Sequence, residues 1–220
     1  KDMQISRDVL VAETESLFYA CRLVAPAEVK INAVKKRLAL AAIPATRTAT
    51  VLEVLDEVYP QLEPAPHVLY TSLHNANPVV HPALTLLNMS YCEYTGGAFD
   101  FYGQSAMPSA LRLVERVDSE RLAVASGLGV EAMPLTQWVD RVYGINEKGL
   151  LETFRSLSTR VYAGIPGPPG PHARYITEDV PMGLVPMACL GRLAGVQTPV
   201  MNLLIELACV LTGTDYWREG

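Results

Sequence analysis

The hydrophobic positions of this chain change their period along its length. In the first 60 residues they form short apolar runs or alternate with polar residues, which is typical of strands. The pattern predicts strands at residues 8–13, 28–34 and 37–43, a short helix at 15–23 and a helix at 46–59. The second and third strands are expected to form a hairpin with Lys35-Lys36 as its polar turn. Three strands cannot form a sheet covered on both faces, so they indicate the last part of a larger α/β sheet.

The rest of the chain carries a helical pattern. Residues 60–66 hold three prolines, which end the preceding helix and mark the expected domain boundary. Helices are then predicted at residues 82–91, 105–117, 119–126, 135–143, 149–158, part of 178–193, and 199–212. The stretch 164–171 is expected to be a loop, and the last helix to be capped by Thr198 and followed by Gly213. The predicted fold class is α+β overall and mainly α.

Composition excludes several classes of protein. Of the 220 residues, 50% are hydrophobic and 19% charged, which excludes global disorder, and a net charge of -5 gives no basic surface for nucleic acid. The four cysteines form no CxxC pair and no zinc-type spacing occurs, so reduced thiols and no metal site are expected. Without a signal peptide or an uncharged apolar run of ~18 residues, a soluble, cytoplasmic protein is expected. The start at Lys1, almost directly before a strand pattern, suggests part of a longer protein.

The segment of residues 72–83 holds two histidines and two asparagines just past the expected boundary. Asn77 and His81 are four residues apart and would share one face of a helix. However, a proline follows Asn77, which disfavours helix there, so a bent loop is expected, with His81 as the cap of a helix that begins at Pro82. The segment is either a polar loop with a capping histidine or the carrier of an acid–base group.

A second polar group lies beside a strongly apolar stretch. Arg174, Glu178 and Asp179 precede residues 180–193, and charges beside a buried segment are costly unless they are paired. One interpretation is an ordinary ion pair at a helix start. The other is an anion-binding arginine together with a carboxylate that orients a histidine.

Three pieces of the sequence together resemble the octopine/nopaline (opine) dehydrogenase family. They are Asn77-Pro-Val-Val-His81-Pro, Arg174-Tyr-Ile-Thr-Glu-Asp179-Val-Pro, and Glu13-Thr-Glu-Ser-Leu-Phe-Tyr-Ala-Cys-Arg22. The third departs slightly, because Phe18 stands where the family usually has a proline. The resemblance covers nearly the whole chain.

The resemblance implies two domains. Residues 1–66 would be the end of a Rossmann domain that binds NAD or NADP, and residues 67–220 the helical domain that carries the catalytic residues. The family's first βαβ unit, with its Gly-rich phosphate turn, has no counterpart here, so the main cofactor-binding segment is expected to be absent and the chain alone inactive. No cofactor-binding residue is therefore assigned. The stretch 127–132 fits G-x-G-x-x-A, but it follows a predicted helix rather than the strand that this fingerprint requires.

The activity implied is the reductive condensation of an α-keto acid with the amino group of an amino acid through an imine. The resemblance assigns His81 as general acid/base and Asp179 as the carboxylate that holds its imidazole. Arg174 would bind a substrate carboxylate and Asn77 a substrate oxygen, and Glu13, Glu15 and Cys21 would also contact substrate. No metal is implied.

Two other functions stay open: a nicotinamide-dependent 2-hydroxy or 2-keto acid dehydrogenase, and a non-catalytic helical interaction domain. The choice between NAD and NADP, the amino acid and the keto acid are also open. So is a homodimer through the helical domain, because an apolar helix at residues 200–211 could be core or interface. Neither a nucleic acid nor a membrane is an expected partner.

Overall fold

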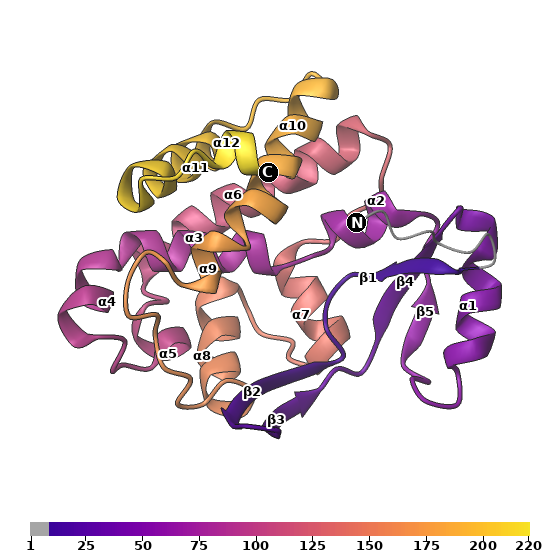
Figure 1. Ribbon diagram of the computed structural model, residues 1–220, viewed down its shortest axis with the longest axis horizontal. Coiled ribbons are helices and arrows are strands. Elements are labelled where there is room, and N and C mark those ends of the chain that lie inside the picture. The colour runs from indigo at the N-terminus through magenta and orange to yellow at the C-terminus, as the bar shows by residue number, and fades with distance from the viewer. Residues whose placement is uncertain (1–8) are drawn as a thin grey trace.

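The strands and the helices occupy different ends of the molecule. The computed structural model describes residues 9–220, so Lys1 and the first residue of the predicted strand 8–13 lie outside it. In Figure 1 the sheet and α1 lie on the right and most helices fill the left, while α7 stands between them. The mainly helical fold class with a small sheet is confirmed.

The sheet has three strands in the order β1-β4-β5. They are β1 (Val11–Thr14), β4 (Leu38–Ile43) and β5 (Leu62–Pro64). β1 pairs antiparallel with β4, and β5 pairs parallel with β4 after a crossover through a 3₁₀ turn (Ala45–Arg47) and α1 (Thr48–Leu55). The central strand β4 is buried on both faces, because α1 covers one face and α2 (Val68–Leu73) the other. A continuous apolar run such as Leu-Ala-Leu-Ala-Ala suits such a strand.

The predicted hairpin and the short helix before it are wrong. Residues 15–23 are not a helix, because β2 (Tyr19–Ala25) pairs antiparallel with β3 (Glu28–Val34) in a separate two-stranded hairpin. Its turn is at Pro26-Ala27, where Ala27 has a φ of 61°. Lys35 is no turn residue: it is 5% exposed, with its ammonium group 5.6 Å from the centre of the Trp138 ring. The Lys35 side chain is therefore buried along its stem, with its ammonium group in a cation–π contact, and does not form the expected polar turn.

The helical unit follows the predicted pattern in most places. Its helices are α3 (Asn77–Leu87), α4 (Met89–Thr95), α5 (Phe101–Gln104), α6 (Pro108–Gly127), α7 (Leu135–Tyr143), α8 (Leu150–Arg160), α9 (Arg174–Thr177), α10 (Val185–Leu193), α11 (Pro199–Thr212) and α12 (Tyr216–Glu219). The two helices predicted at 105–126 are one continuous helix, α6, which packs against α3, α8, α10 and α11. Gly127 is its last residue, so no strand precedes the G-x-G-x-x-A stretch. None of the helices described is long and apolar enough to cross a membrane.

The start of α11 is held by another helix. Thr198 makes no capping hydrogen bond with its side chain, contrary to the prediction. Instead both carboxylate oxygens of the buried Glu120 on α6 accept the backbone N–H groups of Val200 and Met201, each at 2.9 Å. A carboxylate at the positive end of a helix satisfies donors that have no partner within the helix. The predicted end is confirmed, with Gly213 in the left-handed conformation at φ 71°.

The expected loop at Asn77 is a helix. Asn77 is the first residue of α3 and Pro78 the second, a position where a missing N–H costs nothing. His81 is therefore inside the helix and not its cap, and Pro82 is an internal proline. The start of α3 touches the π turn η2 (Val180–Leu184), where a Cβ on Gly183 would overlap the ring of Pro78.

We predict that Gly183→Ala destabilises the protein by about 1–3 kcal/mol, because an added methyl must push α3 and η2 apart. Chemical denaturation followed by circular dichroism measures the change. Gly170→Ala is the matched control, since nothing lies within 4 Å of a Cβ there. Equal stability of the two variants would contradict the close packing of η2 on α3.

Candidate active site

One histidine in the helical unit has both ring nitrogens bound to polar side chains. His81, 9% exposed, lies on α3, with its Nδ1 2.7 Å from Oδ2 of Asp179 and its Nε2 2.9 Å from Oη of Tyr102. Asp179 directly precedes η2, so the contact of η2 with α3 brings together two residues that are 98 positions apart. The structure thus has the His81–Asp179 hydrogen bond that the resemblance implied.

The two partners define the tautomer of this imidazole. The carboxylate oxygen of Asp179 accepts from Nδ1, so Nε2 of the neutral ring accepts from the hydroxyl of Tyr102, whose pKa burial raises well above its usual value. The proton of a neutral His81 is then on Nδ1, where it is donated to Asp179. This arrangement leaves Nε2 as the basic nitrogen, which is the orientation that a carboxylate partner gives to a general base.

Aromatic rings enclose His81. Tyr175 stacks on the imidazole with ring centres 4.2 Å apart, and Tyr162 stacks on Tyr102 at the same distance. Burial also raises the pKa of Tyr162, whose hydroxyl is hydrogen-bonded to that of Tyr143. These rings confine the imidazole to one plane, and they exclude water from the face on which Tyr175 lies.

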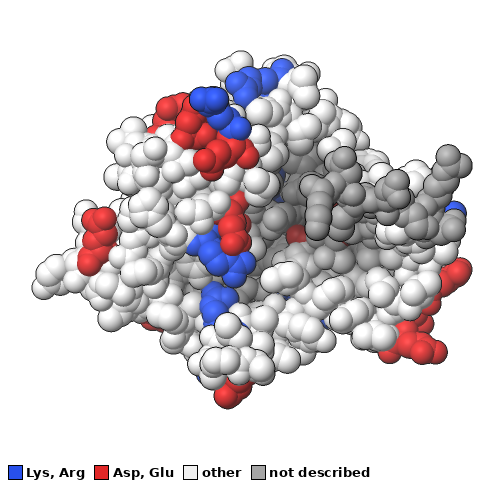
Figure 2. Space-filling view, in the orientation of Figure 1, with Lys and Arg blue, Asp and Glu red and all other residues white. Residues whose placement is uncertain are grey.

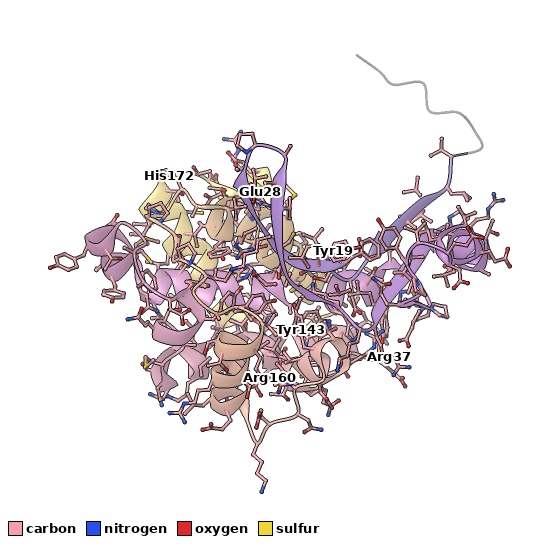
Figure 3. The ribbon with its side chains drawn as sticks, turned by 90° about the horizontal axis from the view of Figure 1, so that it is seen from below. Tyr19, Glu28, Arg37, Tyr143, Arg160 and His172 are labelled. Carbon is pink, nitrogen blue, oxygen red and sulfur yellow. The ribbon has the colours of Figure 1, made fainter. Side chains whose placement is uncertain are left out.

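The open side of His81 faces a cavity of about 560 Å³. Its walls come from the β2–β3 hairpin, the N-terminal turn of α3, the loop at residues 166–168 and α9. Figure 2 shows the hollow between α9 and the hairpin, with side chains of both charges gathered in it. Figure 3, from below, shows the hairpin extending from Tyr19 to its tip at Glu28 across the helical unit. The hairpin, and not the sheet, therefore provides the second wall of the site.

Several of the predicted site residues line this cavity. His81 and Asp179 are joined there by Asn77 and Arg174, and by Cys21 from β2. The Arg174 side chain is 81% exposed, and its Nε and Nη2 donate to the two oxygens of Glu178 at 2.6 and 2.9 Å. Arg174 is thus ion-paired with Glu178, and Asp179 is the carboxylate that contacts the histidine.

Glu13 and Glu15 lie elsewhere. Glu13 accepts hydrogen bonds from the hydroxyls of Thr71 and Ser72 and lines a different cavity. Glu15 is buried at 1% exposure and paired with Arg141 at 2.7 Å. The structure does not bring these two carboxylates to His81: Glu13 lies within β1, and Glu15 directly follows that strand.

Sequence reasoning missed three residues of the site: Tyr102, Tyr175 and Arg22. Tyr175 and Arg22 stand inside the quoted motifs, beside Arg174 and Cys21, so they could have been singled out there. Tyr102 had no such signal, because it reaches His81 from α5 after the Gly-rich turn at residues 96–97.

The other histidine of the segment, His74, is structural. Its Nδ1 is 2.7 Å from the carbonyl oxygen of Tyr70, and its Nε2 accepts the backbone N–H of Met133. Nearby, Arg121 pairs with Asp118 and donates to the carbonyl of Leu73. Burial, the largest cause, lowers the pKa of His74 to about 4. His74 therefore joins the chain before α3 to the segment before α7.

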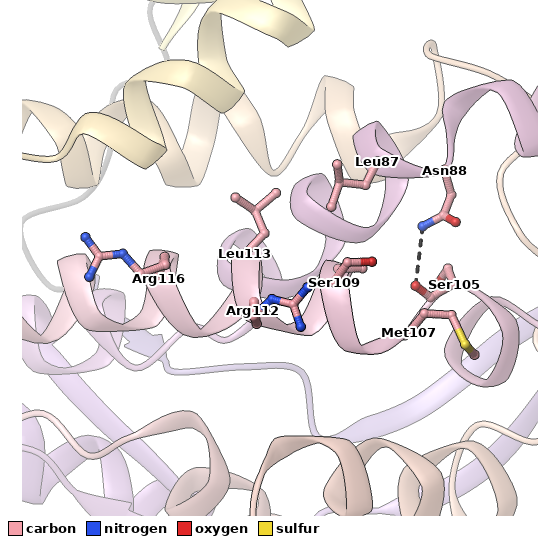
Figure 4. Close-up of a pocket in the computed structure, with 9 residues that line it drawn as sticks. Leu87, Asn88, Ser105, Met107, Ser109, Arg112, Leu113 and Arg116 are labelled. Atoms are coloured by element: carbon pink, nitrogen blue, oxygen red, sulfur yellow. Dashed lines mark hydrogen bonds between the residues drawn. The ribbon is translucent and has the colours of Figure 1, made fainter.

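A second groove carries no acid–base pair. Figure 4 shows it along α6, which contributes Arg112 and Arg116 to its lining, and Nδ2 of Asn88 donates there to the carbonyl of Ser105 at 3.3 Å. Within residues 9–220 no group of three or more His, Cys, Asp or Glu side chains could hold a metal ion. The cavity at His81 is therefore the candidate active site.

Comparison with known proteins decides the family. The model of the NAD/NADP octopine/nopaline dehydrogenase alpha-helical domain matches residues 64–212. The chain belongs to the octopine/nopaline dehydrogenase family.

Relatives within this family are similar over almost the whole chain. An opine dehydrogenase of Arthrobacter sp. (strain 1C) is 37% identical over 97% of this chain and 58% of its own length. The protein ocs of Agrobacterium tumefaciens (strain Ach5) is 29% identical over 96% of this chain and 58% of its own length. This chain thus spans 58% of the length of both relatives. A solved octopine dehydrogenase with NADH and L-arginine has a TM-score of 0.72 at 24% identity, over 93% of this chain and 56% of that one, which shows a shared fold.

We predict that His74 takes up a proton only near pH 4, whereas in the unfolded chain it does so near 6.5. Between these values the unfolded state binds more protons, so the free energy of unfolding falls as the pH drops from 6.5 towards 4. The loss from pH 7 to pH 5 is about 2 kcal/mol. Urea unfolding at both pH values measures it, and His74→Asn should lose less. The same pH dependence in wild type and variant would refute this role.

Proposed function

We propose that the protein containing this chain is an NAD(P)-dependent opine dehydrogenase, which reductively condenses an α-keto acid with the amino group of an amino acid. The single observation that carries the proposal is the buried His81, held by Asp179 and facing the cavity. The membership in the family and the opine dehydrogenase of Arthrobacter support the reaction class.

In this proposal residues 1–66 end a nucleotide-binding domain and residues 67–220 form the catalytic domain. The parallel β4–α1–β5 crossover is the kind of unit that builds Rossmann sheets, and it supports the first assignment. The family match, which begins at residue 64, supports the boundary.

The cavity fits the reactive end of a nicotinamide cofactor. Leu17, Leu23 and Val29 give its hairpin side an apolar, exposed wall beside Tyr19, which suits a flat ring. Octopine dehydrogenase has been solved with NADH, and yersinopine dehydrogenase with NADP⁺. When bound, the cofactor supplies the hydride that reduces the imine.

His81 moves protons during the condensation. An ammonium group that forms an iminium bond with a carbonyl loses two protons, and both leave with the carbonyl oxygen as water. His81 Nε2 takes each of these two protons in turn from the nitrogen and returns it to that oxygen, with Asp179 stabilising the charged ring. Tyr102 holds Nε2 until substrate arrives, because its hydroxyl is the partner that a substrate atom must replace.

The substrate-binding residues act from the wall of the cavity. Arg174 still has Nη1 free of Glu178, so it can donate to a keto-acid carboxylate. Asn77 lies one helical turn before His81 and can hydrogen-bond the carbonyl oxygen of the substrate. Cys21 adds a small side chain opposite them.

The test uses the natural full-length protein. Oxidation of NADH and of NADPH is followed with an α-keto acid alone, an amino acid alone and both together. We predict oxidation only when both are present, and a secondary-amine product by mass spectrometry. Oxidation by the keto acid alone would identify a 2-hydroxy acid dehydrogenase instead, and no oxidation with any pair would favour a non-catalytic domain.

In the same protein, we predict that His81→Ala lowers kcat by ~10²–10⁴ without changing the fold. Asp179→Asn should lower it as well, because an amide can donate to Nδ1 and turn the proton to Nε2. His172→Ala is the matched control, since this exposed histidine does not line the cavity. Wild-type turnover in His81→Ala, with an unchanged circular dichroism spectrum, would remove His81 from the mechanism.

A further inference from the structure

Arg22 on β2 lies in the wall of the candidate active site, and the partners that its guanidinium has among the described residues are neutral. Its Nη2 donates to Oη of Tyr175 at 2.8 Å and its Nη1 to the carbonyl of Cys21 at 3.0 Å. Burial raises the pKa of Tyr175, so that hydroxyl stays neutral. Among residues 9–220, no Asp or Glu is within ion-pair distance of the Arg22 guanidinium.

The cavity holds more positive than negative charge. Arg22, Lys35 and Arg174 line it, while the acidic side chains in its wall are Glu178 and Asp179. Glu178 is ion-paired with Arg174, and Asp179 is hydrogen-bonded to His81. A guanidinium with neutral partners, in a part-buried wall, is a receptor for an anion that comes from outside the protein.

Tyr175 fixes Arg22 relative to the reacting centre. The Tyr175 hydroxyl accepts the Arg22 hydrogen bond, while its ring stacks on His81 at 4.2 Å. The side chain of Tyr175 therefore lies between the Arg22 guanidinium and the His81 imidazole and contacts both. Arg174 lies next to Tyr175 in the sequence and reaches the same cavity from α9. Two guanidiniums therefore approach the space in front of His81, one from the hairpin and one from α9.

We propose that Arg22 binds the carboxylate of the amino-acid substrate, so that the site selects α-amino acids over simple amines and holds a product with two carboxylates. This inference rests on the proposed function and assigns one substrate carboxylate to each arginine. Arg174 binds the carboxylate of the keto acid, and Arg22 binds the carboxylate of the amino acid. The conjugate that forms between them carries its new C–N bond in front of His81.

The test compares an amino acid with the amine formed by its decarboxylation, in the natural full-length protein with saturating keto acid and cofactor. Arg22→Met should lower kcat/KM for the amino acid on the order of 10–100-fold, chiefly through KM, and leave the amine within about twofold. Arg22→Lys should restore part of the loss, because it keeps the charge without the planar fork.

Lys30→Met is the matched control. Lys30 is the cross-strand partner of Arg22 and is exposed, and it does not line the cavity. This variant removes one positive charge from the same hairpin and should leave both substrates unchanged. An equal fall for amino acid and amine in Arg22→Met would overturn the proposal, because it would mean that Arg22 only supports Tyr175 and His81.

A binding measurement separates this proposal from the function on which it rests. Calorimetric titration with an N-(1-carboxyethyl) amino acid, and with the matching N-(1-carboxyethyl) amine, needs no turnover. Wild type should bind the dicarboxylate more tightly, and Arg22→Met should remove the difference. If the protein condenses no keto acid with any amino acid, the proposed reaction is refuted. The titration still shows whether Arg22 binds a carboxylate. A dicarboxylate affinity that Arg22→Met leaves unchanged would refute the role.

Discussion

The buried carboxylate of Glu15 connects the strands to the helices, and the shape of the site depends on it. Oε1 of Glu15 accepts the backbone N–H of Ala39 on β4 and Nη1 of Arg141 on α7, both at 2.7 Å, while Oε2 accepts Nε1 of Trp138. Arg141 also donates to Glu63 on β5. A buried charge is tolerated only with such partners, so α7 cannot shift against the sheet without leaving one unpaired. Glu15 stands between β1 and β2, and it thereby fixes where the hairpin leaves the sheet.

That constraint explains why the site has two walls from distant parts of the sequence. The hairpin brings Arg22 to Tyr175 of α9, and the packing of η2 on α3 brings Asp179 to His81. The first contact is a hydrogen bond to a tyrosine that stacks on the imidazole, and the second is a hydrogen bond to the imidazole itself. The ring therefore has one orientation, with Nδ1 bound to a carboxylate and Nε2 to a hydroxyl that stays protonated. A histidine held in this way is ready to exchange its Nε2 partner for a substrate atom without reorienting.

Much of the helical unit could be predicted from the sequence, but little of the strand pairing could. Helix α7 was expected at residues 135–143 and is found there, because Pro134 and Gly144 mark its ends. The alternation at 28–34 identified a strand, yet alternation contains no information about the partner, and β3 pairs with β2 instead of β4. The predicted contact of His81 and Asp179 came from motif resemblance, since no local pattern links residues 98 positions apart. Tyr102 and the Glu120 cap of α11 depend on tertiary packing alone, which explains why the sequence did not reveal them.

Global charge and local charge lead to different conclusions about the ligand. The chain carries a net charge of -5, which by itself favours no anionic partner. Three acidic side chains, Glu15, Glu120 and Asp118, are buried in hydrogen bonds to helices and strands and do not line the cavity at His81. Within the cavity the balance of charge is positive, because none of the carboxylates of residues 9–220 forms an ion pair with Arg22 or Lys35. An anion entering this hollow meets guanidinium and ammonium groups in a part-buried wall, where screening by salt is weaker than on the open surface. The ligand is therefore selected by the few charges that line the cavity, whatever the sign of the whole chain.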